Sequence, residues 1–287
     1  MPEPLDSEIE DERERLLESW ERAATGWGRQ ADSVREWGLP VALWMIDHAQ
    51  LRPGERVLEL AAGPGDVGFI AAPRIQPGGT LVSSDGVEAM VELARTRAAE
   101  QMIGDVEFRR LQLEWIDLPT ASVDAILCRW GVMLTLDPAA ALQECRRVLR
   151  PGGRIALAVW DLPEANPWVT IAQAAMIQLG ALEPPPKDGP GMFSMAASGR
   201  LIEMLEQAGF FDITVEPVAV TRAYDGVLSW LGETIDCSQI FGRAWRDLDD
   251  DRRRQVRAQL ATASHEFADA DGALAIPGRS LAAVAHA

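Results

Sequence analysis

The chain has few cysteines, and the three that it has lie far apart. Cys128, Cys145 and Cys237 form no C-x-x-C pair in the 287 residues. Disulfide-rich secreted domains and structural zinc sites need cysteines that are paired or closely spaced, so the sequence disfavours both classes. Isolated cysteines are typical of proteins in a reducing compartment, and we expect a cytoplasmic protein.

Long apolar segments and positive charge are also scarce. No apolar stretch reaches the roughly 20 residues that cross a bilayer, and the N-terminus is acidic where a signal peptide would be basic. Lys and Arg number 27 against 44 Asp and Glu, which gives a net charge of −17. Such a charge repels a phosphate backbone. We therefore expect no membrane span and no nucleic-acid partner, but a small-molecule substrate bound by a monomer or homodimer.

The most informative feature is an apolar strand that runs into an acidic residue and then into a glycine turn. It spans residues 57–65, VLELAAGPG, in which Glu59 precedes Gly63 and Gly65. Glycines let a ligand approach the backbone, and N–H groups of the following helix can face its polar end. Asp85 ends the next apolar run, at the spacing of a carboxylate that holds a ribose in a nucleotide-binding βαβ unit. The sequence therefore predicts two ligand-facing strand ends.

Strand and helix patterns alternate around these two strand ends. The alternation predicts right-handed crossovers and a parallel sheet covered on both faces, with ligands at the carboxyl ends of the strands. The predicted strands are 56–60, 80–84, 106–111, 123–128 and 154–160, and the helices between them are 67–72, 87–101 and 138–149.

The pattern is less regular on either side of this alternating region. Proline and glycine in EPPPKDGP predict a rigid exposed link at 183–190. The other predicted elements are helices at 7–24, 40–50, 166–182 and 196–208, a helical stretch at 226–268, and strands at 213–220 and 280–285.

The glycine spacing differs from that of a dinucleotide fingerprint. Ala61 stands where the first glycine of G-x-G-x-x-G belongs, which disfavours a nicotinamide cofactor. Glu59, Gly63 and Gly65 instead match motif I of the class I methyltransferases that use S-adenosylmethionine, and the segment resembles that motif.

The resemblance extends beyond the glycine turn. It includes residues 52–56 (RPGER), Asp85 with Met90, and residues 144–153 (ECRRVLRPGG), and it is strong over about residues 40–160. These segments resemble the methyltransferases grouped with ubiquinone and menaquinone biosynthesis.

The resemblance implies both a fold and a cofactor. The fold is α/β, a Rossmann-like, doubly wound sheet of seven strands whose last strand is antiparallel, with helical insertions as lids. The cofactor is S-adenosyl-L-methionine, and the product is S-adenosyl-L-homocysteine. The expected divisions are an N-terminal helical lid at 1–50, a cofactor-binding core at 51–160, a helical insertion at 161–195, a core helix and strand six at 196–225, a second helical insertion at 226–270, and the final strand at 271–287.

Cofactor contacts also follow from the resemblance. Glu59 would lie near the methionine end, although a structural ion pair is an alternative for it, and Asp85 would accept hydrogen bonds from both ribose hydroxyls. Gln112 stands where the family has Asp, and its amide oxygen can still accept from the adenine amine. The expected contacts are Trp27, Glu59, Ala61, Gly63, Pro64, Gly65, Asp85, Gly86, Met90, Gln112, Leu113, Glu114 and Arg129.

The segment 128–134, CRWGVML, follows the fourth strand, where the reacting sulfonium and the acceptor should meet. We expect Trp130 and Met133 to contact the substrate, because an aromatic face attracts a methylsulfonium or an aromatic acceptor. A packed core position is the alternative for Trp130. Methyl transfer from a sulfonium depends mainly on collinear positioning, so a base is optional, and His265 is the candidate. The sequence shows no metal-ligand cluster, so we expect no requirement for a divalent cation.

Two other functions remain open from the sequence. One is a nicotinamide-dependent oxidoreductase on the same sheet, which the missing first glycine disfavours. The other is a catalytically silent module that keeps the fold for partner recognition, since a fold does not guarantee chemistry. Retention of Glu59, Gly63, Gly65 and Asp85 disfavours the silent module.

Overall fold

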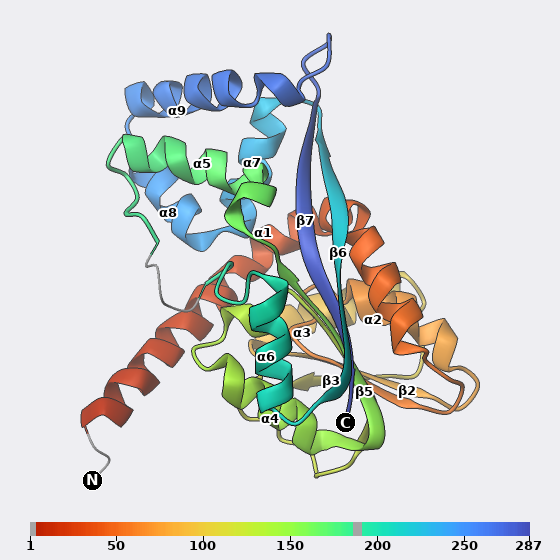
Figure 1. Ribbon diagram of the computed structural model, residues 1–287. Helices are drawn as coiled ribbons and strands as arrows, with labels where there is room; N and C mark the ends of the chain where they lie inside the picture. Colours follow the sequence, from red (N-terminus) through yellow and green to blue (C-terminus); the bar gives the residue numbers. More distant parts are fainter. Residues whose placement is uncertain (1–3, 186–190) are drawn as a thin grey trace.

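The computed structural model describes residues 4–185 and 191–287, and its centre is a seven-stranded sheet (Figure 1). The spatial order is β3-β2-β1-β4-β5-β7-β6, in which β7 is antiparallel to both neighbours and every other pair is parallel. The expected doubly wound sheet with an antiparallel last strand is confirmed. The strands are β1 (Arg56–Glu59), β2 (Thr80–Asp85), β3 (Val106–Arg110), β4 (Val123–Arg129), β5 (Leu149–Trp160), β6 (Phe211–Tyr224) and β7 (Leu274–His286).

The central position of β1 explains its apolar sequence. Leu58 pairs with Val82 of β2 on one side and with Ile126 of β4 on the other, and all three side chains are fully buried. A parallel strand that is covered on both faces reads as a continuous apolar run. Polar residues appear where the strands end, with Glu59 at the end of β1 and Asp85 at the end of β2.

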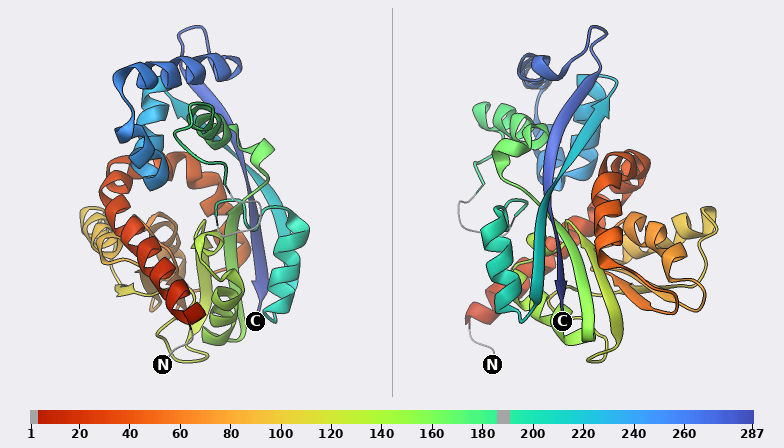
Figure 2. Two further views of the ribbon diagram at one scale, coloured as in Figure 1. Left: turned by 90° about the vertical axis from the view of Figure 1, so that its left-hand side faces the viewer. Right: turned by 45° about the vertical axis from the view of Figure 1, so that its right-hand side comes forward.

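Helices cover the sheet on both faces. α4 contacts α6 and β5 on one face, whereas α1 contacts α2 and α3 on the other (Figures 1 and 2). The helices are α1 (Pro4–Ala49), α2 (Asp66–Ala71), α3 (Glu88–Glu100), α4 (Pro138–Val148), α5 (Pro167–Gln178), α6 (Ser198–Gln207), α7 (Val227–Cys237), α8 (Gln239–Asp247) and α9 (Asp250–Ala263), with short 3₁₀ helices η1 (Ala72–Ile75), η2 (Val132–Leu134), η3 (Pro163–Ala165) and η4 (His265–Phe267).

The N-terminal region is one long helix, whereas the sequence predicted two separate ones. α1 continues from Pro4 to Ala49, and its ribbon bends over the sheet (Figure 2). The stretch between the predicted helices is helical because Ala31, Val34 and Trp37 bury one face of it. Pro40 lies inside the helix, where it removes a backbone hydrogen bond and is a common cause of a bend.

The hairpin of β6 and β7 is longer than predicted and extends beyond the rest of the sheet. Its far end pairs Arg222 with Ile276 and Tyr224 with Leu274. The helices α5, α7, α8 and α9 gather around this extension and form a cap (Figure 1). Residues 186–190 of the predicted link lie outside the described residues. None of the helices in the described ranges is both long and apolar enough to cross a membrane.

Candidate functional site

The turn after β1 is built on left-handed backbone. φ is +49° at Ala61, +52° at Gly63 and +88° at Gly65. A Cβ on Gly65 would lie 2.4 Å from Cζ of Phe69, so a side chain does not fit there. At Gly63, in contrast, no atom of the described residues lies within 4 Å of the place where a Cβ would stand, apart from Gly63 itself and its two neighbours in the chain. The turn therefore presents open backbone beside the end of β1.

Asp85 faces this turn from the end of β2. Its Oδ2 accepts a hydrogen bond from the Gly63 N–H at 2.9 Å, and its Oδ1 accepts one from the Val87 N–H at 3.3 Å. Burial raises the pKa of Asp85 to about 6, although the backbone N–H groups lower it. A carboxylate offers about four acceptor positions. The half-buried Asp85 therefore keeps the capacity to accept from two hydroxyl groups.

Glu59 lies behind the turn and is 2% exposed. Its Oε1 accepts from the Gly68 N–H at 2.7 Å, and its Oε2 accepts from the Ser83 hydroxyl at 3.2 Å. Burial raises the pKa of Glu59 to about 7. Glu59 thus connects β1 to α2 and β2, and a direct contact with the methionine end of a cofactor stays a prediction.

A small hydrophobic cluster, separate from the main core, places α1 over the end of β2. Its buried members are Ala23 and Ala24 of α1 with Val87 and Met90 near the start of α3. A Cβ on Gly86 would lie 3.3 Å from the Leu17 side chain, so α1 also contacts the position that follows Asp85. Partly buried side chains that pack on the cluster are Leu17, Trp20, Trp27, Ala89 and Leu93.

The loop after β3 completes this end of the sheet. The Leu111 N–H donates to the Asp85 carbonyl oxygen at 2.9 Å, which brings the half-buried Gln112 and Leu113 beside the end of β2. Glu114 Oε1 accepts from the Leu136 N–H at 3.1 Å and from the following N–H at 3.2 Å. Gln112 and Leu113 are thus near the predicted adenine side, while Glu114 holds the β4–α4 loop.

Arg129 at the end of β4 pairs with a carboxylate that the sequence analysis did not assign. Arg129 Nη2 lies 3.4 Å from Oδ2 of Asp66, the first residue of α2, and Nη1 donates to the Gly38 carbonyl at 3.2 Å. Both side chains are buried, and Arg97 lies 3.6 Å from the same carboxylate. Burial lowers the pKa of the Arg129 guanidinium. The position of Asp66 directly after the glycine turn was the available signal.

Four tryptophans meet at the carboxyl ends of β4 and β5, and we call them the tryptophan cluster. They are Trp37 of α1, Trp130 after β4, Trp160 at the end of β5 and Trp168 of α5. The centroids of Trp130 and Trp160 are 4.5 Å apart, those of Trp130 and Trp37 are 5.0 Å apart, and those of Trp160 and Trp168 are 5.0 Å apart. All four side chains are buried.

The tryptophan cluster begins next to the glycine turn. A Cβ on Gly131 would lie 2.5 Å from Cβ of Ala61, so the loop that carries Trp130 touches the turn. Trp130 has φ +59°, and its indole N–H donates to the Ser280 hydroxyl at 2.9 Å. Met133 is buried, and its sulfur accepts from the Trp160 N–H at 3.4 Å. A left-handed backbone at a bulky residue costs energy and often marks a functional site.

A buried polar group lies on the other side of the tryptophan cluster. The guanidinium carbon of Arg222 is 3.9 Å from the Trp37 ring centroid and 3.7 Å from that of Trp168. Arg222 Nη2 donates to Glu233 Oε1 at 2.6 Å, and the Tyr224 hydroxyl donates to the same oxygen at 2.8 Å. The sequence analysis did not identify Arg222 or Glu233, because they lie in the hairpin and in the predicted helical insertion.

Comparisons with known proteins agree with this geometry. A family described as Methyltransferase domain matches residues 51–209. The chain belongs to this methyltransferase family. It is 29% identical over 230 residues to the Nocamycin O-methyltransferase of Saccharothrix syringae, which covers 77% of this chain and 81% of that protein. It is 30% identical over 193 residues to the Ubiquinone/menaquinone biosynthesis C-methyltransferase UbiE of Hahella chejuensis, which covers 61% of this chain and 76% of that protein.

Solved structures show the same fold. The crystal structure of the YcgJ protein from Bacillus subtilis aligns with a TM-score of 0.59 and 20% sequence identity, covering 86% of this chain and 97% of that chain. Membership of the methyltransferase family supports an S-adenosylmethionine-dependent enzyme and leaves the nicotinamide-dependent alternative without support.

The strand ends of the methyltransferase have a donor and acceptor set that fits the cofactor. Asp85 supplies a carboxylate with acceptor capacity for the ribose, and the open backbone at Gly63 lets the ligand approach. Pro64 and Gly65 lie in the same turn, and Trp27 of α1 is half-buried, with its indole N–H donating to the Cys237 carbonyl at 3.2 Å. The predicted contacts thus surround the ends of β1 and β2, and Arg129 lies at the end of the adjacent β4.

His265 of the methyltransferase lies apart from these residues. It is exposed and belongs to η4, between α9 and the tip of the β6–β7 hairpin. Within the described ranges, no hydrogen bond, ion pair or ring contact joins its side chain to the glycine turn or the tryptophan cluster. This placement gives no support to a catalytic role, which stays a prediction.

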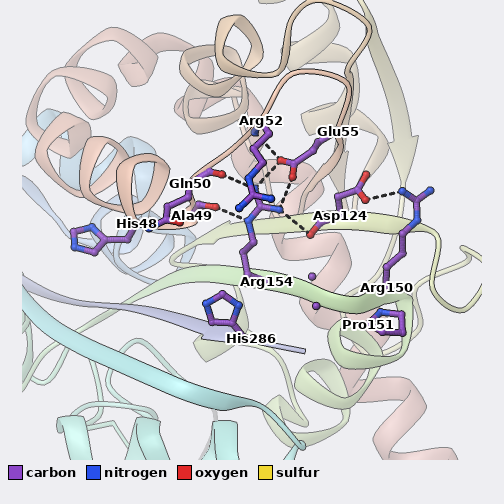
Figure 3. A pocket seen from close by; sticks show the side chains of 12 residues that line it. His48, Ala49, Gln50, Arg52, Glu55, Asp124, Arg150, Pro151, Arg154 and His286 are labelled. Carbon is purple, nitrogen blue, oxygen red and sulfur yellow. Dashed lines mark hydrogen bonds and ion pairs between the residues drawn. The ribbon is translucent and has the colours of Figure 1, made fainter.

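A polar cavity of about 260 Å³ lies at the opposite, amino-terminal end of the sheet (Figure 3). Arg154 occupies its centre and donates to both carboxylate oxygens of Glu55, at 2.8 and 2.6 Å. It also donates to backbone carbonyls of Ala49, Gln50 and Asp124. The guanidinium is thus fully used by the protein, and we interpret this cavity as structural.

Proposed function

We propose that the enzyme transfers a methyl group from S-adenosylmethionine to a small, apolar or aromatic molecule by in-line displacement. The contact between Gly131 and Ala61 carries this proposal, because it sets the tryptophan cluster directly beside the predicted cofactor turn. Aromatic side chains bind planar molecules and attract a methylsulfonium. The name of the Saccharothrix relative, an O-methyltransferase, is consistent with this class of reaction.

The bound cofactor supplies an electrophilic methyl group on a positively charged sulfur. The residues proposed to hold it are those at the ends of β1, β2 and β3, with Asp85 accepting from the ribose hydroxyls and Met90 on the adenine side. Trp130 and Met133 are the proposed acceptor contacts. Since positioning supplies most of the rate, the protein needs to hold the acceptor collinear with the methyl carbon and sulfur, while α1 and the cap exclude water.

Titration calorimetry with S-adenosylhomocysteine tests the cofactor site. We expect Asp85→Ala to raise the dissociation constant by at least about tenfold, because hydrogen bonds to a charged group are lost. Asp117→Ala is the matched control, since this exposed carboxylate has no assigned role. No heat from the unmodified protein at millimolar ligand would contradict the proposal.

A turnover assay distinguishes an active methyltransferase from a catalytically silent module. Methyl transfer from S-adenosylmethionine to any member of a panel of phenols, enols and amines supports an enzyme, and binding without transfer to any of them supports the silent module. We expect EDTA to leave turnover unchanged. His265→Ala tests the optional base: loss of kcat by about a hundredfold or more would support it, and an unchanged kcat would remove it. We further propose a cytoplasmic monomer or homodimer without nucleic-acid partners.

A further inference from the structure

Two buried N–H donors, one in the tryptophan cluster and one beside it, have no hydrogen-bond partner in the described residues. They are Nε of Arg222 and Nε1 of Trp37, and neither finds a partner among residues 4–185 and 191–287. Arg222 is 4% exposed and Trp37 is 7% exposed. Buried donors are nearly always paired, so an unpaired one needs an explanation. Two of them in side chains that contact each other point to a shared missing acceptor.

The stacking of Arg222 restricts where this acceptor can lie. Its guanidinium carbon lies 3.9 Å from the ring centroid of Trp37 and 3.7 Å from that of Trp168, and these two rings are inclined at 36° to each other. An oxygen that pairs with Nε therefore lies close to two indole rings, one of which carries the second unpaired N–H. Indole rings favour contact with an aromatic or conjugated group, so they suit an acceptor that carries this oxygen on a planar ring better than a phosphate or sulfate.

The charge of Arg222 is already balanced. Glu233 Oε1 accepts from Arg222 at 2.6 Å, and its Oε2 accepts from the Ser33 hydroxyl at 2.5 Å. The pair is 2–4% exposed and carries no net charge. A further full charge would be poorly compensated in this environment. The free donors therefore suit the oxygen of a phenol, an enol or a ketone better than a carboxylate.

The tryptophan cluster divides between the sheet and its cover. Trp130 and Trp160 belong to the ends of β4 and β5, and Trp130 is fixed by its bond to Ser280. Trp37 and Trp168 belong to α1 and α5, which lie over the sheet. Since Trp37 and Trp130 are stacked at 5.0 Å, an acceptor between the two pairs requires α1 and α5 to move outward. Trp130 would then lie toward the glycine turn and Arg222 at the remote side.

We propose that the methyl acceptor is a planar phenol, enol or ketone held in the tryptophan cluster, with one oxygen anchored by Arg222 Nε–H and Trp37 Nε1–H. This inference rests on the proposed function. The anchored oxygen lies away from the glycine turn, so Arg222 and Trp37 determine specificity and orient the acceptor rather than take part in the transfer.

Matched ring pairs test the anchor. 1-Indanone is compared with indane, and 2-naphthol with naphthalene, by calorimetry on the full-length protein saturated with S-adenosylhomocysteine. We expect at least one oxygenated ring to bind on the order of tenfold tighter than its partner. In Trp37→Phe, which keeps the ring face and removes the N–H, this preference should fall to less than about threefold, and Arg222→Lys should have the same effect.

Trp168→Phe is the matched control. It removes an indole N–H that already donates to Asn166 Oδ1 at 3.1 Å. Binding of both members of a ring pair should therefore weaken by the same factor, and the preference for the oxygenated ring should remain. The proposal is overturned if no oxygenated ring is preferred, if no ring binds, or if Trp168→Phe and Trp37→Phe reduce the preference equally. A lack of S-adenosylhomocysteine binding would instead overturn the proposed function, and this is measured before any ring is added.

Discussion

Glu59 combines a buried carboxyl group with a pKa near neutrality. Its pKa is about 7 in the folded chain against an ordinary value of 4.5, so the folded state binds more protons between these values. Stability must therefore fall as the pH rises from about 4.5 to about 7. We expect Glu59→Gln, which mimics the protonated acid, to remove this component and to gain up to roughly 3 kcal/mol at pH 7.5.

Urea unfolding at several pH values measures this effect. Glutamine can accept from the Gly68 N–H and donate to the Ser83 hydroxyl, so both hydrogen bonds of Glu59 can be kept. The pKa of Asp85 is raised to about 6, so part of the slope should persist in the variant. An identical slope in both proteins would mean that Glu59 is ionised throughout this range.

Gly131 and Ala61 form a second residue-level pair. A Cβ on Gly131 would meet Ala61 Cβ at 2.5 Å and Cys128 Sγ at 2.9 Å, although its backbone, at φ −97°, accepts any residue. We expect Gly131→Ala to cost about 1–3 kcal/mol through overpacking. Ala61→Gly removes one of the two clashes and a left-handed alanine, so the double variant should recover part of the loss. Additive effects in thermal unfolding would show that the two positions do not touch.

Residues of the site differ in how well the sequence reveals them. Glu59, Gly63 and Asp85 follow apolar strands, so their shared edge of the sheet is predictable from spacing alone. Arg222 and Glu233 give no such signal, because their meeting with Trp37 depends on how α1 and the hairpin pack. A tryptophan in an irregular segment is interpreted from sequence as a core residue. Only its neighbours in the folded structure show whether it belongs to a binding surface or to core packing.

At the level of elements, α1 is held to the cap by a close backbone contact. A Cβ on Gly26 would lie 2.2 Å from the Asp236 carbonyl oxygen at the end of α7, and Gln30 donates to the Asp236 carboxylate at 2.7 Å. We expect Gly26→Ala to push α1 away from α7. The loss should appear as faster amide hydrogen exchange over residues 10–30 and as weaker S-adenosylhomocysteine binding.

Gly232→Ala provides the control for this prediction. Gly232 lies inside α7, and apart from its chain neighbours and the backbone of the helix itself, no atom of the described residues stands within 4 Å of its Cβ position. Alanine there should stabilise the helix by up to about 1 kcal/mol and leave α1 in place. Unchanged exchange in Gly26→Ala would show that α1 does not depend on the α7 contact.

The elements differ from their sequence prediction where periodicity is weak. The strands of the βαβ region start and end within a few residues of the predicted bounds, apart from β5, because apolar runs and glycine turns delimit them. β6 and β7 are longer than their predicted strands. In the half of the hairpin on which the cap packs, exposed and buried residues alternate, so no apolar run marks the strands there. The middle of α1 contains Gly26 and Gly28, which obscured a helix that tertiary packing stabilises.

At the level of the whole molecule, the two ends of the sheet have different roles. The carboxyl ends carry Asp85, the open turn and the tryptophan cluster, whereas the amino ends carry Arg154, which joins the end of α1 to β1, β4 and β5. Arg154 is 8% exposed, and each of its bonds goes to the protein itself. We therefore expect the amino end to serve stability and the carboxyl end to serve binding.

Opposite responses to two conservative substitutions test this division. Lysine cannot reproduce the planar fork of Arg154, so Arg154→Lys should lower the free energy of unfolding by about 3 kcal/mol and change S-adenosylhomocysteine affinity by less than about twofold. Asp85→Asn should weaken that affinity by at least about tenfold and cost less stability than Arg154→Lys, because it loses one accepted N–H bond but removes a charge whose pKa is raised. Urea unfolding and calorimetry on both variants measure the two quantities. If Arg154→Lys impaired binding as strongly as Asp85→Asn, the two ends would be coupled, and the cavity in Figure 3 would need a functional explanation.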